Sequence, residues 1–339
     1  MDFRKLLFKK NNRIKFVRYL SKDELKKYNE RWHLGFFLKI KILVRKIFNF
    51  LNKNIHINKS RAISNVIKKY DKGSGGQVLG NKDPTYEYIG YWEDKKVASI
   101  QGRPHHQLTF FLKNLIKEKN FDSFLEVGAG ELTTTMSLVE DLEDYKIKKS
   151  AAIDISFKRV EAGKNYFNEK KKKLDVIARS NAKNLPFDDD TFNISYTNYC
   201  LEQVPHLFDK IVDEIIRVTS DIIVLLEPSF EFGDKYTKNK IIIRNYPVIN
   251  KNSFKNKSCE LLYRGSMPYG RYNNHGEIIV LKKKENKNKE NINSSKIKLL
   301  CPITKEELIK EGNFYISKKH KNKYPIKDGI PMLAEFDKL

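Results

Sequence analysis

A short apolar run, Phe124-Leu125, ends at two glycines that are two residues apart, and a helix-like segment then starts at Leu132. The turn reads Glu126-Val127-Gly128-Ala129-Gly130. Glycine permits the tight turn and lets a ligand approach the main chain. Free N–H groups and the positive dipole end at a helix start favour an anionic or strongly polar ligand. Gly-x-Gly also occurs in turns that bind nothing, so the motif alone leaves both interpretations open.

A second apolar run, Ala151–Ile153, ends in a carboxylate, Asp154, and the next helix starts near Ser156. An acidic residue about 20 positions after a glycine turn, at the tip of the next strand, is placed to bind both hydroxyls of an adenosine ribose. The alternative is a carboxylate that only stabilises the start of the following helix. Asp154 is therefore a candidate ligand-binding residue.

With the segments that follow, the chain resembles the class I S-adenosylmethionine-dependent methyltransferases, particularly the branch with quinone and small-molecule methyltransferases. The resemblance covers residues ~105–283 and implies a Rossmann-like, doubly wound α/β sheet, mostly parallel, with an antiparallel edge hairpin. Two positions depart from the family pattern: Leu132 replaces a third glycine, and Asn181 replaces an acidic residue that contacts the adenine amine. The landmarks are, in order, Glu126-x-Gly-x-Gly, Asp154, the loop Leu185-Pro-Phe-Asp-Asp-Asp-x-Phe192, Tyr199–His206 and the strand Asp221–Pro228.

The resemblance implies S-adenosylmethionine as cofactor and assigns a binding set. Residues of the glycine turn would hold its amino-acid end, Asp154 the ribose, the 181–185 segment the adenine, and residues 198–199 would lie next to the methyl group. Asn181 could still accept a hydrogen bond from the adenine amine through its carbonyl. A dinucleotide-binding site is disfavoured, since Thr133 stands where its fingerprint needs glycine. The expected cofactor-binding residues are Glu126, Gly128, Ala129, Gly130, Asp154, Ile155, Asn181, Ala182, Leu185, Asn198 and Tyr199.

The implied reaction is in-line transfer of a methyl group to a nucleophilic oxygen or nitrogen. A hydroxyl acceptor would need a general base, for which His206, His105 and His106 are candidates. An amine acceptor can react without one, and the alternative for His206, at a helix start, is a capping or packing role. The family also places acceptor residues just before the first strand, which adds Tyr91 and Trp92 as candidates; a surface aromatic turn is the alternative.

The formal net charge of +24 suggests a nucleic-acid partner but is unevenly spread. Residues 1–60 hold 17 Lys and Arg against 4 Asp and Glu, whereas residues 121–230 hold 14 against 20. The expected cofactor domain is thus acidic, and nucleic acid is not the favoured partner. The three cysteines share no metal-ligand spacing, so we expect neither disulfides nor a metal site. We expect a cytoplasmic protein, with no secretory signal and no membrane-spanning helix.

The first ~70 residues form a separately patterned, basic and helical extension. Apolar residues between Phe36 and Leu51 recur on one helix face, with lysine and arginine opposite. Such a helix could contact an anionic membrane surface peripherally or pack on the catalytic domain. Asp71–Gly76 reads as a flexible junction to the methyltransferase domain, expected over 71–282.

The end of the chain predicts two further units. Gly276–Leu281 reads as a final strand after a turn at 269–275, and 283–297 is a lysine- and asparagine-rich linker. Residues 298–339 resemble the small activator subunit that partners tRNA and protein methyltransferases, through Tyr324-Pro-Ile-x-Asp-Gly-Ile-Pro331. Relatives that bind zinc use several cysteines, but only Cys301 remains here, so no metal is expected. By analogy, this small β-rich unit would dock in cis on an edge of the larger sheet.

Three functions remain open from the sequence. The first is an O- or N-methyltransferase acting on a small molecule or saccharide, with a membrane-surface variant. The second is a tRNA or protein methyltransferase assisted by its activator-like tail. The third is a non-catalytic binding or assembly protein that keeps the fold.

Overall fold

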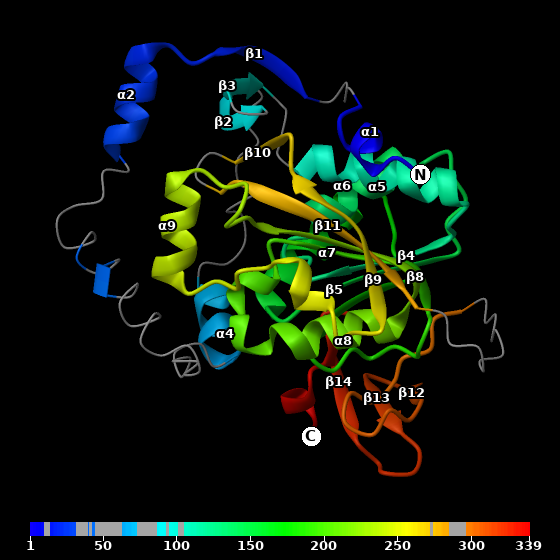
Figure 1. Cartoon of the computed structure of the whole chain (residues 1–339). Coiled ribbons are helices and arrows are strands. Elements are labelled where there is room, and N and C mark those ends of the chain that lie inside the picture. The colour runs from blue at the N-terminus through cyan, green and yellow to red at the C-terminus, as the bar shows by residue number, and fades with distance from the viewer. Residues whose placement is uncertain are drawn as a thin grey trace.

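The computed structural model describes residues 1–9, 14–31, 40, 43–44, 63–72, 87–92, 95–100, 105–271, 274–284 and 296–339. An eleven-stranded sheet has the order β12-β13-β14-β15-β6-β5-β4-β7-β8-β11-β9 (Figure 1). Its five central strands are parallel, which confirms the expected Rossmann-like α/β core. These strands are β4 (Ser123–Val127), β5 (Lys149–Asp154), β6 (Val176–Ser180), β7 (Phe192–Asn198) and β8 (Thr219–Pro228).

Alternating side chains of the central strands build two buried layers. Phe124 of β4 packs with Leu108 and Phe111 on one face. Its neighbour Leu125 packs on the opposite face with helix α8. This alternation follows from the two-residue period of a strand, and it fixes which helices cover which face. The helices are α5 (His105–Lys119), α6 (Thr133–Asp141), α7 (Phe157–Glu169), α8 (Phe208–Val218) and α9 (Lys235–Arg244), with 3₁₀ turns η1 (Leu201–Gln203), η2 (Pro205–Leu207) and η3 (Lys251–Phe254).

The antiparallel end of the sheet is formed by β11 (Gly276–Lys283) and β9 (Cys259–Ser266). The expected antiparallel hairpin is confirmed, but β11 lies between β8 and β9, and β9 is the edge strand. β11 also extends through Lys283, which was expected to lie in the linker. The reason is that β9 continues beside it, with Cys259 opposite Lys283. The Lys283 side chain also has partners, since its Nζ donates to the Arg217 carbonyl at 3.0 Å and pairs with Asp190.

The N-terminal extension is only partly helical. It contains α1 (Phe3–Leu7), α2 (Lys22–Arg31) and α4 (Ile63–Lys72), but also a strand, β1 (Lys15–Tyr19). β1 pairs with β3, a partner some 80 residues later, which no pattern within the extension could reveal. The second sheet has the order β1-β3-β2-β10, with β2 (Glu87–Trp92), β3 (Lys95–Ile100) and β10 (Tyr269–Arg271).

Two expectations for this region fall wholly or partly outside the described residues. The amphipathic helix over Phe36–Leu51 does so except at residues 40, 43 and 44. Of the junction over 71–76, only Asp71 and Lys72 are described, and both belong to α4. In the described part of the chain, no helix is long and apolar enough to cross a membrane, and no group of His, Cys, Asp and Glu side chains could hold a metal ion.

The C-terminal residues extend the large sheet at its other edge. β12 (Leu308–Glu311), β13 (Phe314–Ser317), β14 (Lys323–Lys327) and β15 (Ile330–Leu333) form an antiparallel series. β15 then pairs in parallel with β6, so this unit docks in cis on a sheet edge as expected. Cys301 and Tyr324 join the buried core that includes α8, which explains how so small a unit stays folded. A 3₁₀ turn, η4 (Glu335–Asp337), follows β15.

Candidate functional site

A cavity of 370 Å³ lies where β4, β5, β6 and β7 end. In open α/β sheets, ligands bind at the carboxyl ends of the parallel strands. The structure brings ten of the eleven expected cofactor-binding residues to this cavity; Leu185 is fully buried in the core behind it. The ten are Glu126, Gly128, Ala129, Gly130, Asp154, Ile155, Asn181, Ala182, Asn198 and Tyr199.

The two glycines of the first turn need to be glycine. Gly128 and Gly130 have φ values of 76° and 56°, in the left-handed region that other residues avoid. A Cβ at Gly128 would lie 2.2 Å from Cys200 Sγ, and one at Gly130 would lie 2.6 Å from the Arg159 guanidinium. The turn therefore lets neighbouring side chains and a ligand approach its main chain closely.

Asp154 ends β5 with its carboxylate in the cavity wall. Its Oδ2 accepts from the Gly130 amide at 2.9 Å, and its Oδ1 accepts from the Ser156 amide at 2.8 Å. Each carboxylate oxygen can accept a second hydrogen bond, so both retain capacity for ligand hydroxyls. The helix-start role proposed as an alternative belongs to Ser156, whose hydroxyl accepts from the Arg159 amide at 3.3 Å.

Glu126, at the end of β4, is 1% exposed. Burial raises the pKa of its carboxyl to about 7, and hydrogen bonds from Thr135 and Tyr196 oppose that shift. Tyr196 donates to Oε2 at 3.1 Å. The carboxyl thus joins β4, α6 and β7 directly below the glycine turn.

Asn198 Oδ1 and Ser180 Oγ, both in the cavity wall, are buried without a hydrogen-bond partner among the described residues. The Asn198 amide nitrogen donates to Thr134 Oγ1 at 2.9 Å, so the carbonyl oxygen of the same amide faces away from Thr134. A buried acceptor left unpaired costs about 1–3 kcal/mol. A polar ligand in the cavity would offset that cost.

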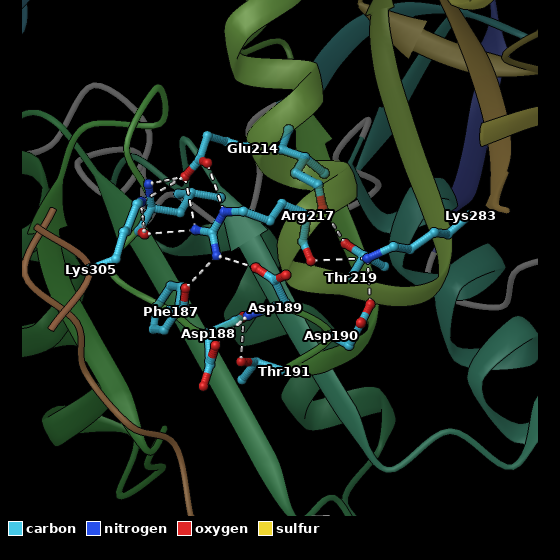
Figure 2. Close-up of polar contacts among 12 residues, drawn as sticks. Phe187, Asp188, Asp189, Asp190, Thr191, Glu214, Arg217, Thr219, Lys283 and Lys305 are labelled. Carbon is cyan, nitrogen blue, oxygen red and sulfur yellow. Dashed lines mark hydrogen bonds and ion pairs between the residues drawn. The ribbon is translucent and has the colours of Figure 1, made fainter. Parts of the chain in front are cut away.

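The loop that contains Leu185 is anchored by one arginine, Arg217 (Figure 2). Its guanidinium donates to the carbonyls of Leu185 at 3.1 Å and Phe187 at 2.8 Å. It also binds Asp189 at 3.0 Å and both carboxylate oxygens of Glu214 at 2.7 and 2.9 Å. The Leu185 amide in turn donates to Glu214 Oε2 at 2.8 Å. Leu185 therefore supports this wall from behind.

A second group of lining residues, which comes from outside the strand ends and is called the second wall here, consists of His105, Lys240, Tyr269, Gly270 and Asn274. His105 is buried, and its Nε2 lies 3.1 Å from Ser137 Oγ. Lys240 donates to the Asn274 side chain at 2.7 Å. This wall combines an imidazole, an ammonium, a phenol and an amide, which suits a polar acceptor.

The other acceptor candidates lie away from the cavity lining. His106 is half-buried beside the His105 ring, and His206 is exposed in η2. Tyr91 stacks on His275 with ring centroids 4.0 Å apart and accepts from the Gly276 amide at 3.1 Å. Trp92 packs against Tyr269. Tyr91 thus attaches the small sheet to β11, whereas Trp92 packs within the small sheet, because Tyr269 belongs to β10.

Sequence reasoning missed several lining residues. Ile63, Val66, Lys69 and Tyr70 come from α4, and nothing in the local pattern of α4 indicates this distant contact. Asp71 Oδ1 accepts from Ser156 Oγ at 2.5 Å, which fastens α4 to the start of α7. Arg159 could have been predicted from the sequence as a lining residue, because it lies in the first turn of the helix that follows Asp154. Its guanidinium lies 5.0 Å from the Tyr70 ring centroid.

Residues 125–221 match a family model described as a methyltransferase domain. A comparison with curated proteins finds no match. Among solved structures, the chain is similar to magnesium protoporphyrin IX methyltransferase (ChlM) from Synechocystis PCC 6803 with bound SAM, at 10% identity and TM-score 0.41, over 53% of this chain and 80% of that one. It is also similar to the CurJ carbon methyltransferase, at 12% identity and TM-score 0.42, over 53% of this chain and 54% of that one. A chain of the complex containing the Haloferax volcanii Trm112 methyltransferase activator is similar at 11% identity and TM-score 0.39, over 50% of this chain and 84% of that one.

The matched domain shows that the protein is an enzyme, an S-adenosylmethionine-dependent methyltransferase, and that S-adenosylmethionine is its cofactor. The residues of the cavity fit that cofactor. The Asp154 carboxylate has acceptor capacity left, and Asn198 Oδ1 is buried without a hydrogen-bond partner among the described residues. These acceptors suit the amino and hydroxyl groups of such a ligand.

Proposed function

We propose that this S-adenosylmethionine-dependent methyltransferase methylates an oxygen or nitrogen atom of a small molecule or saccharide. The observation that carries the proposal is one cavity with two unlike walls. One wall consists of strand ends, and the other presents His105, Lys240 and Tyr269. Elements remote in sequence, α4 and β10, also contribute lining residues.

In this proposal the strand ends hold the cofactor. Glu126 and the turn Gly128-Ala129-Gly130 hold its amino-acid end, and Asp154 and Ile155 hold the ribose. Asn181 and Ala182 border the adenine, with Leu185 behind them, and Asn198 and Tyr199 lie next to the reacting group. When bound, S-adenosylmethionine supplies a methyl group on a positively charged sulfur.

The chain's own contribution is alignment, exclusion of water and movement of one proton. A hydroxyl acceptor must lose its proton as it is methylated, and an imidazole accepts protons near neutral pH. His105 is the candidate base, because it is the one histidine of the three predicted that lines the cavity. An amine that binds in its neutral form needs no such base.

The docked C-terminal unit favours a second candidate, a tRNA or protein methyltransferase with a fused activator-like domain. β15 pairs with the edge strand of the methyltransferase domain, which is how such a subunit would be expected to bind.

Peripheral membrane contact through residues 36–51 is a separate proposal. Its test is whether deletion of this segment abolishes binding to anionic vesicles.

The experiment is methyl transfer from isotopically labelled S-adenosylmethionine to panels of small hydroxyl and amine compounds, saccharides, unmodified tRNA and protein. Labelled O- or N-methyl products from small compounds support the proposal. Labelling of tRNA or protein alone would replace it with the second candidate. A product methylated on carbon would contradict the proposed acceptor chemistry but not the enzyme class.

A further inference from the structure

The C-terminal turn η4 lies against the adenine end of the proposed cofactor site. β15 pairs with β6 so that Met332 lies opposite Arg179 and Leu333 opposite Ser180. The two parallel segments then continue in the same direction. One leads into the cavity residues Asn181 and Ala182, and the other into Glu335–Asp337.

Glu335 fixes which way the Asn181 amide faces. The Asn181 side-chain nitrogen donates to Glu335 Oε1 at 2.9 Å. Since a carboxylate only accepts hydrogen bonds, the amide nitrogen must face it. The Asn181 Oδ1 accepts from the Lys183 amide at 3.3 Å, which requires the same orientation. Lys183 Nζ lies 2.7 Å from the same Glu335 oxygen and holds the carboxylate in place.

Asp337 connects the same turn to the ribose side of the cavity. Its Oδ1 accepts from the Arg179 guanidinium at 2.5 Å, and Arg179 Nε donates to the Ile155 carbonyl at 3.0 Å. The Arg179 guanidinium also lies 5.0 Å from the Phe336 ring centroid. Arg179 and Asp337 are largely buried, with 12% and 7% of their side chains exposed. Two bridges thus join one C-terminal turn to two lining residues.

We propose that Glu335 is a positioning residue that makes Asn181 present its carbonyl oxygen, and so selects a purine with a 6-amino group over one with a 6-oxo group. This inference rests on the proposed cofactor site. A free asparagine could rotate its amide and donate to an oxo group equally well. With its nitrogen held by Glu335, it offers an acceptor, which pairs with an amino group and opposes a carbonyl. The C-terminal unit would thereby set cofactor specificity from outside the matched domain.

The test is calorimetric binding of S-adenosylhomocysteine and of its deaminated 6-oxo analogue to the full-length protein. We expect the wild type to prefer the 6-amino ligand by about 10- to 100-fold, the cost of opposing two acceptors. Glu335→Ala frees the Asn181 amide, so the preference falls to about 3-fold or less. Glu335→Gln, which keeps the side chain's size, should give an intermediate preference and serves if the alanine variant is unstable. Adding Asn181→Asp to Glu335→Ala should restore the preference, since a carboxylate accepts whichever way it turns.

Glu311→Ala, an exposed glutamate of the same C-terminal unit, is the matched control and should keep the wild-type preference. An unchanged preference in both Glu335 variants, with S-adenosylhomocysteine still bound, would overturn the inference and leave the proposed function intact. Failure of the wild type to bind S-adenosylhomocysteine would instead overturn the cofactor site itself. A merely structural role for Glu335 would weaken both ligands equally, which also counts against the inference.

Discussion

The two walls of the cavity are built in opposite ways. The cofactor wall comes mainly from one continuous stretch, from Glu126 to Val204, in which strand ends are fixed by hydrogen bonds to neighbouring backbone. The second wall, to which the proposal assigns the acceptor and which is called the acceptor wall below, combines residues of α5, α9 and β10 with Asn274, two residues before β11. His105 and Asn274 are therefore separated by most of the domain. The first wall is held by the sheet, whereas the second depends on how separate elements pack over it.

This difference predicts separable functions. A wall made of strand ends keeps its geometry because any shift would break the parallel ladder. A wall made of two helices, a short edge strand of the other sheet and one connecting residue can change its side chains without disturbing that ladder, as functional segments on a rigid scaffold generally do. Mutations in the cofactor wall should therefore affect cofactor binding, and mutations in the acceptor wall should affect turnover.

The largest expected effect on cofactor binding is at Asp154. Asp154→Ala removes the charged acceptor proposed for the ribose hydroxyls, and affinity for S-adenosylhomocysteine should fall about 100-fold, or about 2.7 kcal/mol. Calorimetric titration measures this. Asp122→Ala is the matched control, because Asp122 lies at the opposite end of the sheet, just before β4, and pairs with Lys148 at 2.7 Å. Equal affinities for both variants and the wild type would remove Asp154 from the cofactor wall.

His105 tests the other wall. With a hydroxyl acceptor, His105→Asn should lower kcat about 100-fold through loss of the base, while affinity for S-adenosylhomocysteine changes less than about 2-fold. His106→Asn should leave both quantities near wild type, because His106 lies beside His105 but outside the cavity lining. Steady-state kinetics separates the two outcomes. A large loss of cofactor affinity in His105→Asn would show that the walls are not separable.

The contrast between the walls also explains what sequence could predict. Asp154 follows Gly130 by 24 residues along one strand–helix–strand unit, so local pattern placed it correctly at the cavity. Lys240 and Tyr70 reach the cavity only through tertiary packing, and no local period or motif marks them. β9 was likewise missed: its burial alternates only from Cys259 to Tyr263 and loses that period at Arg264, so its pairing with β11 decides its place.

The C-terminal unit was predictable in part from the sequence. Its resemblance predicted docking on a sheet edge, and the parallel pairing of β15 with β6 fits that prediction. The bond between Glu335 and Asn181 was not predictable, because it joins residues 154 positions apart through one side-chain pair. Resemblance can thus predict an edge pairing, but not the individual polar contacts beside it.

Arg217 tests how much of the cofactor wall's rigidity comes from its polar anchor. Arg217→Ala leaves the Phe187 carbonyl and the Glu214 carboxylate short of partners, and should lower the free energy of unfolding by about 2–4 kcal/mol. Arg217→Lys should be intermediate, since an ammonium cannot span the same acceptors. Arg244→Ala, an exposed arginine at the end of α9, should change stability by less than about 0.5 kcal/mol. Urea unfolding gives these values, and a neutral Arg217→Ala would show that the loop is held by its apolar residues alone.

The smallest expected effect is that of Glu227 on the pH dependence of stability. Its Oε1 accepts from the Cys200 and Leu201 amides at 3.1 and 3.0 Å, so it holds the turn that closes the cofactor wall. Burial, then repulsion from Glu202, raises the pKa of Glu227 to about 8 from its ordinary value of 4.5.

Between these two pKa values the folded protein binds a proton that the unfolded chain releases, so the free energy of unfolding should fall as pH rises. The slope from one such carboxyl is at most about 1.4 kcal/mol per pH unit. Glu126 and Glu277, with pKa values of about 7, add the same sign at lower pH, whereas Cys301, whose pKa is lowered to about 7, adds the opposite sign above pH 7. The difference between the wild type and Glu227→Gln therefore isolates Glu227, and urea unfolding from pH 7 to 8 should show the wild type losing stability relative to Glu227→Gln. Parallel profiles would mean that Glu227 stays ionised in the folded protein, and that its hydrogen bonds to the turn outweigh the cost of burying its charge.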